Sequence, residues 1–419
     1  MSRRAAVVLV IFIALVLGAV GLRVWLARRP GAAEAFAGWF EAYPSGERLV
    51  LAPARFADLA GWREDALEEA VPVFLRSCGV IAGQPDDASL GGGGIAGRAG
   101  DWKPVCAAAA RLPAGDRAAA RRFFETELRP WSVRNHRNPV GLFTGYYEPL
   151  LQGSRKRHGR FTVPLYARPP ELVMVDLGRF RDTLKGQRIA GQVVKGSLLP
   201  FPDRHAIDAG ALAGRKLEIA WVDDPVGAFF LQVQGSGRVR LEDGKELRVG
   251  YAAQNGRPYT AIGRELIARH ALAAKDVSLQ TIRAWLEAHP GQAREVMERN
   301  ASYVFFQVFF QTSRGNGPLG AEGIPLTPGR SLAVDLSQHA LGVPVWLVGG
   351  APSPRPGEPD RRLRRLLVAQ DTGGAIRGPV RGDVFWGFGP DAEAIAGRMK
   401  NRGKMWLLLP KALTPKEAS

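Results

Sequence analysis

The sequence predicts a mainly β fold with flanking helices, in which a β-barrel domain is interrupted by an inserted domain. Its 419 residues are enough for two or three domains. The 50 Gly and 30 Pro favour short strands and many turns over a helical bundle. Segments rich in strand-forming residues lie on both sides of a mixed central segment, which is why an insertion is expected.

The N-terminus predicts export. Arg3 and Arg4 precede an uncharged apolar run from Ala5 to Leu22, which is long enough to span a membrane. Basic residues before such a run favour a cytoplasmic N-terminus. We expect residues 1–30 to be an uncleaved signal anchor, with cleavage near Ala32 as the alternative. No Cys follows the run, so a lipoprotein anchor is not expected.

The exported chain is expected to begin with helices. Apolar residues recur at helical spacing from Asp58 to Phe74, with Pro72 expected to start a turn or to kink the helix. Gly91 to Gly94 predict a flexible, exposed loop. A second helix is expected from Asp116 to Leu128.

Strands are expected from Val140 onward, where aromatic and β-branched residues become dense. Asp243-Gly244 predicts a tight hairpin. Helices are expected at residues 260–270 and from Ser278, whose hydroxyl can cap the helix. The expected strands are residues 140–147, 216–222, 227–233, 237–241, 303–306, 331–335, 344–348, 364–369 and 405–409.

Cys78 and Cys106 are the only cysteines. In an exported chain, two cysteines favour a disulfide, with two buried thiols as the alternative. Two Cys lack the spacing of a metal site, and the six His form no close pair, so no metal ion is expected.

The formal charge of +17 suits an anionic partner such as nucleic acid, a lipid surface or an acidic polymer. General solubility is an equally good explanation of the charge. No basic block is interleaved with aromatic residues, so nucleic-acid binding is not expected.

Several catalytic classes lack their motifs. The sequence contains no Gly-x-Ser-x-Gly elbow and no Walker loop. Residues 315–320 match Gly-x-Gly-x-x-Gly, but Pro318 stands where a helix would have to open.

The aspartates Asp335, Asp371 and Asp383 each adjoin an apolar strand. Asp383 lies between Gly382 and the run Val384-Phe-Trp386, so desolvation should raise its pKa. A carboxylic acid that stays protonated near neutral pH can donate to a departing glycosidic oxygen. Turn capping is the commoner use of such an Asp and remains the alternative.

A second group of residues supplies the stacking faces and hydrogen-bonding groups that suit sugar binding. The aromatic members could equally pack in a barrel core. The group is Thr144, Tyr146, Tyr147, Gln232, Gln234, Asn255, Tyr259 and Trp386.

Together these segments resemble the membrane-bound lytic murein transglycosylase A family, including its terminal module named for three aspartates. The resemblance covers roughly residues 55–410. The matching stretches, in order, are Phe143-Thr-Gly-Tyr-Tyr-Glu-Pro149, Val163-Pro-Leu-Tyr166, Arg168-Pro-Pro170, Phe230-Leu-Gln-Val-Gln-Gly-Ser-Gly237, Gln254-Asn-Gly-Arg-Pro-Tyr259, Asn300-Ala-Ser-Tyr-Val-Phe-Phe306, Ser331-Leu-Ala-Val-Asp335, Gln370-Asp-Thr-Gly-Gly-Ala-Ile376 and Gly382-Asp-Val-Phe-Trp-Gly387.

The resemblance implies a double-psi β-barrel domain built from residues 31–149 and 313–415, a β-rich domain inserted at 150–312, and a groove between them. The family's aspartate trio falls on Asp335, Asp371 and Asp383, with Asp383 as the catalytic acid and base. No cofactor is implied. The residues that would bind the glycan are Thr144, Gly145, Tyr146, Tyr147, Gln232, Gln234, Gly235, Ser236, Asn255, Tyr259, Gly373, Gly374 and Phe385.

The implied reaction makes the chain a polysaccharide lyase. It cleaves the β-1,4 bond between N-acetylmuramic acid and N-acetylglucosamine in peptidoglycan, acts from strand ends, and leaves a 1,6-anhydro ring. The implied location is the periplasmic face of a bacterial membrane, with glycan strands as partner and cell-wall synthesis or division complexes as further candidates. Two alternatives remain: an ordinary muramidase with Glu148 as its second carboxylate, and a catalytically silent murein-binding scaffold. Many relatives are lipoproteins, a point on which this chain departs from the family.

Overall fold

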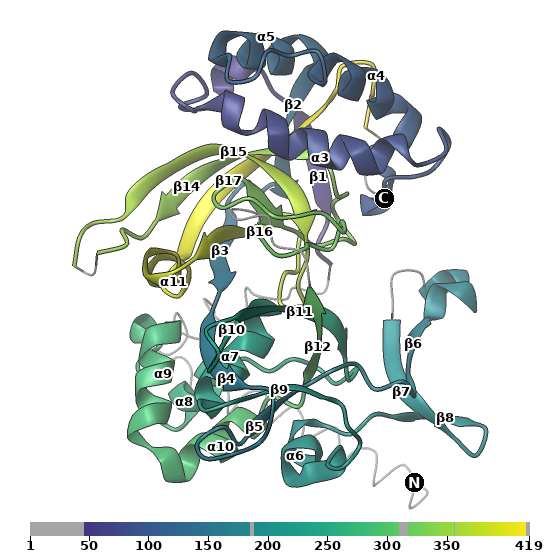
Figure 1. The fold of residues 1–419 in the computed structure, drawn as a ribbon. Helices are drawn as coiled ribbons and strands as arrows, with labels where there is room; N and C mark the ends of the chain where they lie inside the picture. The colour runs from purple at the N-terminus through teal and green to yellow at the C-terminus, as the bar shows by residue number, and fades with distance from the viewer. Residues whose placement is uncertain (1–45, 185–187, 310–316, 356, 416–419) are drawn as a thin grey trace, which may run out of the picture. The chain divides into compact units, whose positions relative to one another are not determined.

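The computed structural model describes residues 46–184, 188–309, 317–355 and 357–415 (Figure 1). The predicted anchor at residues 1–30 lies outside them. Within the described ranges, the helices are all too short or too polar to cross a membrane. Leu49–Ser419 form one compact unit.

Six strands close into a barrel in the order β3, β17, β14, β15, β13 and β16, with β16 pairing back to β3. The strands β1 and β2 extend this sheet beyond β17. The expectation of a mainly β fold with a β-barrel is therefore confirmed. The strands are β1 (Leu49–Pro53), β2 (Leu128–Asn135), β3 (Gly141–Glu148), β13 (Ser331–Ala333), β14 (Pro344–Ala351), β15 (Arg361–Asp371), β16 (Arg381–Phe388) and β17 (Lys400–Pro410).

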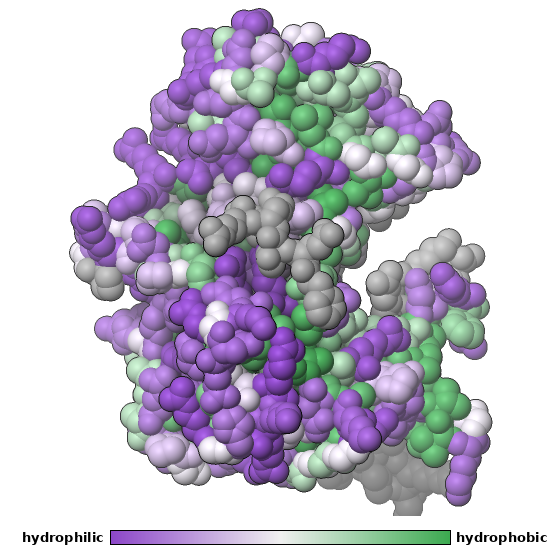
Figure 2. Space-filling model, in the orientation of Figure 1, coloured by the Kyte–Doolittle hydropathy of each residue, from purple (hydrophilic) through white to green (hydrophobic). Residues whose placement is uncertain are grey.

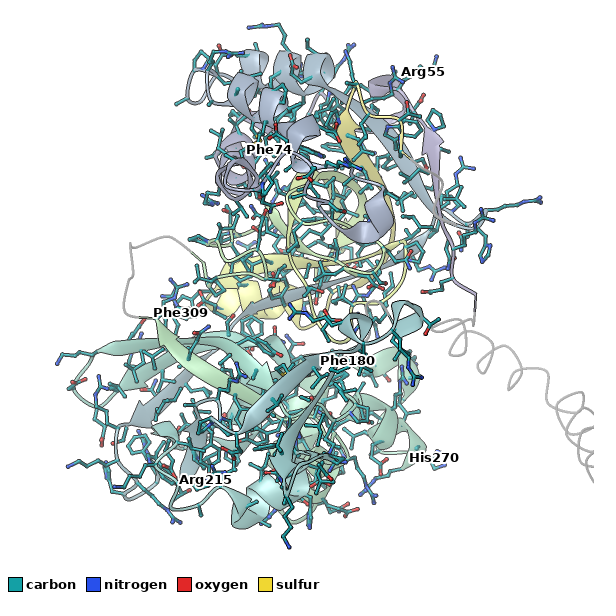
Figure 3. The ribbon with its side chains drawn as sticks, turned by 90° about the vertical axis from the view of Figure 1, so that its right-hand side faces the viewer. Arg55, Phe74, Phe180, Arg215, His270 and Phe309 are labelled. Atoms are coloured by element: carbon teal, nitrogen blue, oxygen red, sulfur yellow. A yellow bond between two sulfur atoms is a disulfide. The ribbon has the colours of Figure 1, made fainter. Side chains whose placement is uncertain are left out.

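A layer of helices packs on the barrel and shares one large core with it (Figure 1). The layer consists of α3 (Val71–Ala82), α4 (Ala99–Ala109) and α5 (Arg117–Glu127). Phe74, labelled in Figure 3, packs within it against Trp102 and Phe124. Trp62 then meets Trp346 of β14 edge to face, with 5.1 Å between the ring centroids. Aromatic packing thus fixes the helices on the barrel.

A disulfide joins α3 to α4 through Cys78 and Cys106, with an S–S distance of 2.07 Å. The two residues are 28 positions apart in sequence, so the bond closes a loop that would be open in the unfolded chain.

We expect the double variant Cys78→Ser/Cys106→Ser to lower the free energy of unfolding by about 3 to 4 kcal/mol, the loop-entropy cost of a closed loop of this length. Denaturant unfolding measures this loss when the variant is compared with the oxidised and the reduced wild-type protein. Equal stability of all three proteins would contradict the prediction.

The chain passes from β3 into a second, six-stranded sheet at Pro149, in the order β12, β11, β10, β4, β9 and β5. Asp243-Gly244 forms the predicted hairpin between β10 and β11. The predicted return to the barrel near residue 313 lies outside the described residues. The strands are β4 (Leu150–Ser154), β5 (Val163–Tyr166), β9 (Glu218–Val222), β10 (Ser236–Leu241), β11 (Glu246–Gln254) and β12 (Val304–Phe309).

Helices and a small third sheet complete this central part of the chain. Near the C-terminus a further helix, α11 (Pro390–Ala396), packs on β3 and β16. The helices of the central part are α6 (Arg204–Ala206), α7 (Pro225–Gln234), α8 (Ile262–Ala268), α9 (Leu279–Ala288) and α10 (Pro290–Glu298), and the third sheet contains β6 (Leu172–Asp176), β7 (Arg188–Val194) and β8 (Ser197–Pro200).

The helix predicted from Asp58 is wrong before residue 71. Turns and two short 3-10 helices, Phe56–Asp58 and Leu67–Glu69, occupy this segment. Pro72 stands in the first turn of α3. A proline cannot donate a hydrogen bond and clashes with the preceding turn, so it begins a helix here instead of kinking one.

The strand predicted at residues 227–233 is also wrong, because this segment lies within helix α7. Asp224 caps the helix by accepting from the Gly227 amide at 2.8 Å, and Pro225 occupies its first turn. Nearly every side chain of α7 is buried, so no polar face marked it as a helix in the sequence.

The glycine-rich segment at residues 91–94 is only partly the exposed loop that was expected. Gly91 pairs with Ala340, and Gly92 is buried. A Cβ on Gly92 would lie 2.5 Å from the His339 carbonyl carbon, so glycine is required there by close packing.

Candidate active site

Asp383 lies on β16 opposite Thr144 of β3, and the two strands run parallel. Directly opposed residues leave a sheet on the same face. The Thr144 hydroxyl donates to Asp383 Oδ1 at 2.8 Å. Because 239 positions separate the two residues in sequence, the pair forms only when the barrel closes.

The environment of Asp383 shifts the pKa of its carboxyl group upward. The residue is half-buried. Burial raises the pKa of Asp383, while the charge of Arg381 and the hydrogen bond from Thr144 act in the opposite direction. The direction agrees with the sequence prediction that desolvation raises the pKa of this carboxyl group.

Arg381 controls the orientation of the Thr144 hydroxyl. Its Nη2 donates to that hydroxyl at 2.8 Å. The hydroxyl accepts from the arginine and donates its own proton to Asp383. Arg381 is not among the site residues predicted from the sequence, although its position two residues before Asp383 on a strand places it on the same face.

Asp371 ends β15 close enough to Asp383 for their charges to interact. Its Oδ2 accepts from the Tyr146 hydroxyl at 2.8 Å and its Oδ1 from the Ala321 amide at 2.9 Å. Burial raises the pKa of Asp371 to about 6 against these hydrogen bonds, and the charge of Asp383 adds to the rise. The contact from Ala321 was not predicted, since no local sequence signal connects it to Asp371.

Asp335 holds the loop that precedes β16. Its Oδ2 accepts from the Gly378 amide at 2.8 Å, and its Oδ1 accepts from the amide and hydroxyl of Ser337 at 3.0 and 2.8 Å. Asp335 is only 3% exposed. Asp335 therefore caps the loop that immediately precedes β16, the strand that carries Asp383.

Strand β3 divides the predicted glycan-binding residues between its two faces. Thr144 and Tyr146 point toward Asp383 and Asp371. Gly145 faces the other way, where a Cβ would lie 2.7 Å from the Trp386 ring. Tyr147 is 2% exposed and packs against α11.

The turn after α7 lies against β3. Gln234 Oε1 accepts from the Tyr147 amide at 3.1 Å. Gly235 ends the helix in the left-handed conformation, with φ at 79°. Ser236 begins β10 and is 7% exposed.

Gln232 and Asn255 are engaged by the protein itself. Gln232 Oε1 accepts from Arg204 at 2.7 Å. Asn255 is fully buried, its amide group donates to two backbone carbonyls, and its Oδ1 accepts from the Tyr303 amide at 2.9 Å. These contacts hold together the segments around β11 and β12 and leave little capacity for an external ligand.

The remaining predicted residues differ in exposure. Tyr259, in the loop after β11, is 42% exposed. Gly373 and Gly374 lie in the loop just after Asp371, and Gly374 is exposed. Phe385 is fully buried and packs against the Tyr146 ring, with 5.2 Å between the centroids.

Glu148 is bound by two arginines. Arg248 donates to both of its oxygens at 3.0 and 2.9 Å, and Arg238 adds a contact at 3.3 Å. Glu148 is 1% exposed. A carboxylate paired in this way has no free oxygen with which to reach a substrate.

Across the described ranges, His, Cys, Asp and Glu side chains form no group of three or more that could hold a metal ion. Asp335, Asp371 and Glu148 each accept from two or more donors, whereas Asp383 accepts from the Thr144 hydroxyl.

Comparisons with known proteins match both parts of the chain. Residues 142–307 match the family described as the MltA specific insert domain, and residues 330–409 match the 3D domain. The membrane-bound lytic murein transglycosylase A of Escherichia coli strain K12 is 34% identical over 271 residues, which are 64% of this chain and 65% of that protein. The match thus spans less than two thirds of this relative.

Solved structures match over more of their length. The crystal structure of the membrane-bound lytic murein transglycosylase from Agrobacterium tumefaciens is 36% identical, with a TM-score of 0.76 over 86% of this chain and 98% of that one. The structure of Escherichia coli MltA with bound chitohexaose is 26% identical, with a TM-score of 0.61 over 88% of this chain and 97% of that one. The sequence motifs, the barrel and these matches agree, and the chain belongs to the membrane-bound lytic murein transglycosylase A family.

Proposed function

We propose that this chain is a lytic transglycosylase that cleaves peptidoglycan between N-acetylmuramic acid and N-acetylglucosamine, with Asp383 as its acid and base. The observation that carries the proposal is the half-buried Asp383, held by Thr144 and with a raised pKa. The activity named for the Escherichia coli and Agrobacterium tumefaciens relatives supports it.

The reaction begins with proton donation. Protonated Asp383 donates to the glycosidic oxygen as the bond from that oxygen to the muramyl C1 breaks. The Asp383 carboxylate then accepts the proton of the muramyl C6 hydroxyl, whose oxygen bonds to C1 and closes a 1,6-anhydro ring. The carboxyl group is thereby restored, and water is not consumed.

One carboxyl group suffices because the nucleophile belongs to the substrate. Ordinary glycosidases use two carboxyl groups. Glu148, the candidate for a second one, is paired with Arg248 and Arg238. Asp371 accepts from Tyr146 and Ala321, so it is better placed to position the site than to activate water. A muramidase is therefore the weaker proposal.

The glycan would lie in a groove between a double-psi barrel domain, residues 31–149 and 313–415, and the inserted domain, residues 150–312. Residues with accessible surface next to the Asp383 strand or at the insert would contact it: Thr144, Gln234, Gly235, Tyr259, Gly373 and Gly374. The buried Tyr146, Tyr147, Gln232, Ser236, Asn255 and Phe385, together with the half-buried Gly145, would support these residues from behind. A bound chitohexaose in the Escherichia coli relative supports an extended sugar site.

The proposed location is the periplasmic face of a bacterial membrane, with residues 1–30 as the anchor. The word "membrane-bound" in the names of the Escherichia coli and Vibrio cholerae relatives supports membrane association. Complexes with cell-wall synthesis or division proteins are a further part of this proposal.

Mass spectrometry of the soluble products from purified murein sacculi tests the function. Cleavage as proposed yields muropeptides one water lighter than hydrolytic products, and action from strand ends releases disaccharide-peptides from the start of the digestion. Reducing-end products would mean a hydrolase. Binding to sacculi without any release would mean a scaffold.

The charge of Arg381 leads us to a further prediction, on how the activity depends on pH. Arg381 lowers the pKa of Asp383, so Arg381→Gln should raise it. Since the acid must be protonated, activity falls as pH rises through this pKa, and the variant should keep its activity to higher pH than the wild type. The pH profile of kcat/KM measures the shift.

Arg402→Gln provides the control, because it removes an exposed arginine from β17 opposite Leu142, at the same end of β3. An unmoved alkaline limb in Arg381→Gln, or an equal shift in Arg402→Gln, would contradict the assignment of Asp383 as the acid.

A further inference from the structure

The third sheet carries an exposed face made only of apolar residues and glycine. Its strands β6, β7 and β8 pair antiparallel, with Val173 opposite Gly191, Val175 opposite Ile189, and Val193 opposite Leu198. Opposed residues share a face, so one face consists of Val173, Val175, Ile189, Gly191, Val193, Leu198 and Pro200, called here the aliphatic face.

The aliphatic face is open to solvent. Ile189 is 43% exposed, Val193 59% and Leu198 39%. Figure 2 shows apolar side chains gathered over these strands at the right-hand edge of the view. Part of the opposite face turns toward the protein, since Leu172 is buried and Ala190 lies against Gly256, while Val194 and Leu199 at its far end are exposed. The two faces differ in composition, because the opposite face also carries the polar residues Asp176, Gln192 and Ser197.

Basic residues lie beyond both ends of the aliphatic face. Lys195 occupies the turn between β7 and β8, and is exposed. Arg179 and Arg181 flank Phe180 just after β6, at the other end of the strands, and all three are exposed. Phe180 is 72% exposed, and Figure 3 labels it.

We propose that the aliphatic face docks on the surface of an anionic lipid bilayer. Exposed contiguous apolar surface marks an interaction site, and the absence of any polar side chain on the face suits the acyl chains of lipids, which offer no hydrogen-bonding partners. Protein interfaces instead enrich Tyr, Trp and Arg at their core. Basic residues at both ends and a net charge of +17 complement anionic headgroups.

The docking would orient the inserted domain on the membrane. It is separate from the predicted anchor at residues 1–30, because it uses a folded sheet within the compact unit Leu49–Ser419. Each hydrophobic core cluster found among the described residues lies within that unit, so a chain that begins at residue 31 retains these clusters.

Vesicle flotation of residues 31–419 tests the proposal without the anchor. The protein should float with vesicles of phosphatidylethanolamine and phosphatidylglycerol, and less with vesicles of phosphatidylcholine alone. Added salt should weaken the binding. Val193→Asp/Leu198→Asp should weaken it by about tenfold or more, since it places two carboxylates on the face that enters the anionic interface.

Val194→Asp/Leu199→Asp is the matched control. These residues are the next ones on the same two strands, are 40% and 46% exposed, and lie on the opposite face. The control should bind vesicles as the wild type does. Both variants should release products from isolated sacculi at the wild-type rate, which shows that they are folded.

The absence of vesicle binding, or equal losses in the two variants, would overturn the proposal. So would a dimer in sedimentation that Val193→Asp/Leu198→Asp alone converts to monomers, because the face would then be covered by a second copy of the chain.

Discussion

Asp383→Asn is expected to abolish product release from sacculi while leaving the fold intact. The amide has nearly the shape of the carboxyl group, and can still accept from the Thr144 hydroxyl, which now donates to Asp383 Oδ1 at 2.8 Å. It cannot donate a proton to the glycosidic oxygen or accept one from the C6 hydroxyl. Since both proposed steps use this group, the rate should fall by at least about a thousandfold, within the range that general acid-base catalysis contributes.

Product mass spectrometry with wild-type protein and Asp383→Asn measures the loss. Thermal unfolding of both proteins shows whether the fold is retained. Glu148→Gln tests the alternative that the chain is a muramidase. A muramidase that used Glu148 as its second carboxylate would lose activity on this substitution, although the Asp383 site itself is unchanged. Substantial turnover by folded Asp383→Asn would overturn the assignment.

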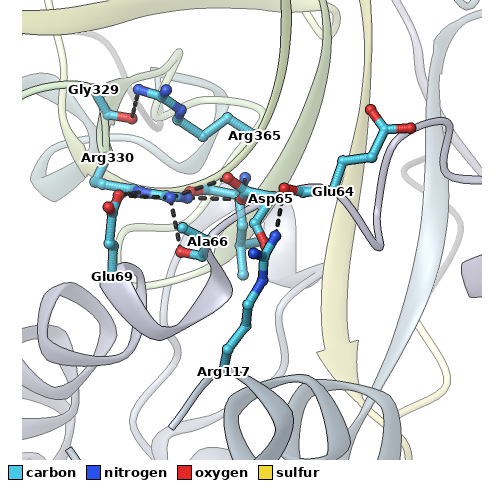
Figure 4. Close-up of polar contacts among 9 residues, drawn as sticks. Glu64, Asp65, Ala66, Glu69, Arg117, Gly329, Arg330 and Arg365 are labelled. Carbon is cyan, nitrogen blue, oxygen red and sulfur yellow. Dashed lines mark hydrogen bonds and ion pairs between the residues drawn. The ribbon is translucent and has the colours of Figure 1, made fainter. Parts of the chain in front are cut away.

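Asp65→Ala is expected to destabilise the protein by about 3 to 5 kcal/mol, the cost of leaving a buried charge without its partner. Arg330, just before β13, is 3% exposed and contacts Asp65 through both terminal nitrogens, at 2.7 and 3.0 Å (Figure 4). Asp65 Oδ2 also accepts from the Leu366 amide at 2.9 Å. The substitution would therefore remove the buried anionic partner of the guanidinium, which keeps only backbone carbonyls and the exposed Glu69 as acceptors, and would leave the Leu366 amide without its acceptor.

Glu69→Ala is the matched control for the same arginine. Glu69 Oε2 accepts from Arg330 at 2.9 Å, but its side chain is 63% exposed. Exposed ion pairs contribute up to about 1 kcal/mol, so this variant should be close to wild type. Denaturant unfolding measures the stability of both variants. Similar losses of stability in Asp65→Ala and Glu69→Ala would contradict the larger contribution expected of Asp65.

Local sequence predicted the elements whose signals are local. The dense aromatic run gave β3, Asp116 marked the start of α5, and Asp243-Gly244 marked the hairpin. The pattern failed where burial is uniform, as in α7, and where Pro72 divides a run of apolar residues. In both places the tertiary packing decides between helix and strand or turn.

The candidate site was predictable in its residue types but not in its contacts. Asp383 and Thr144 were both identified from motifs, whereas their hydrogen bond depends on the pairing of β16 with β3 across 239 positions. The burial of Asn255 and the two arginines at Glu148 depend on packing that no single segment reveals. The family resemblance supplied the candidate residues, and the fold separates those that lie beside Asp383 from those that are buried elsewhere.

The barrel closes by pairing an early strand with strands made much later, so the candidate site cannot form before those later strands exist. β3 is made early, but Asp383 and the strand β17 that also pairs with β3 come last. A chain still being synthesised has Thr144 without Asp383, and so lacks the proposed acid. With the proposed function, such an enzyme would stay inert until its last barrel strands have been made, which would protect a cell from an unfinished lytic protein.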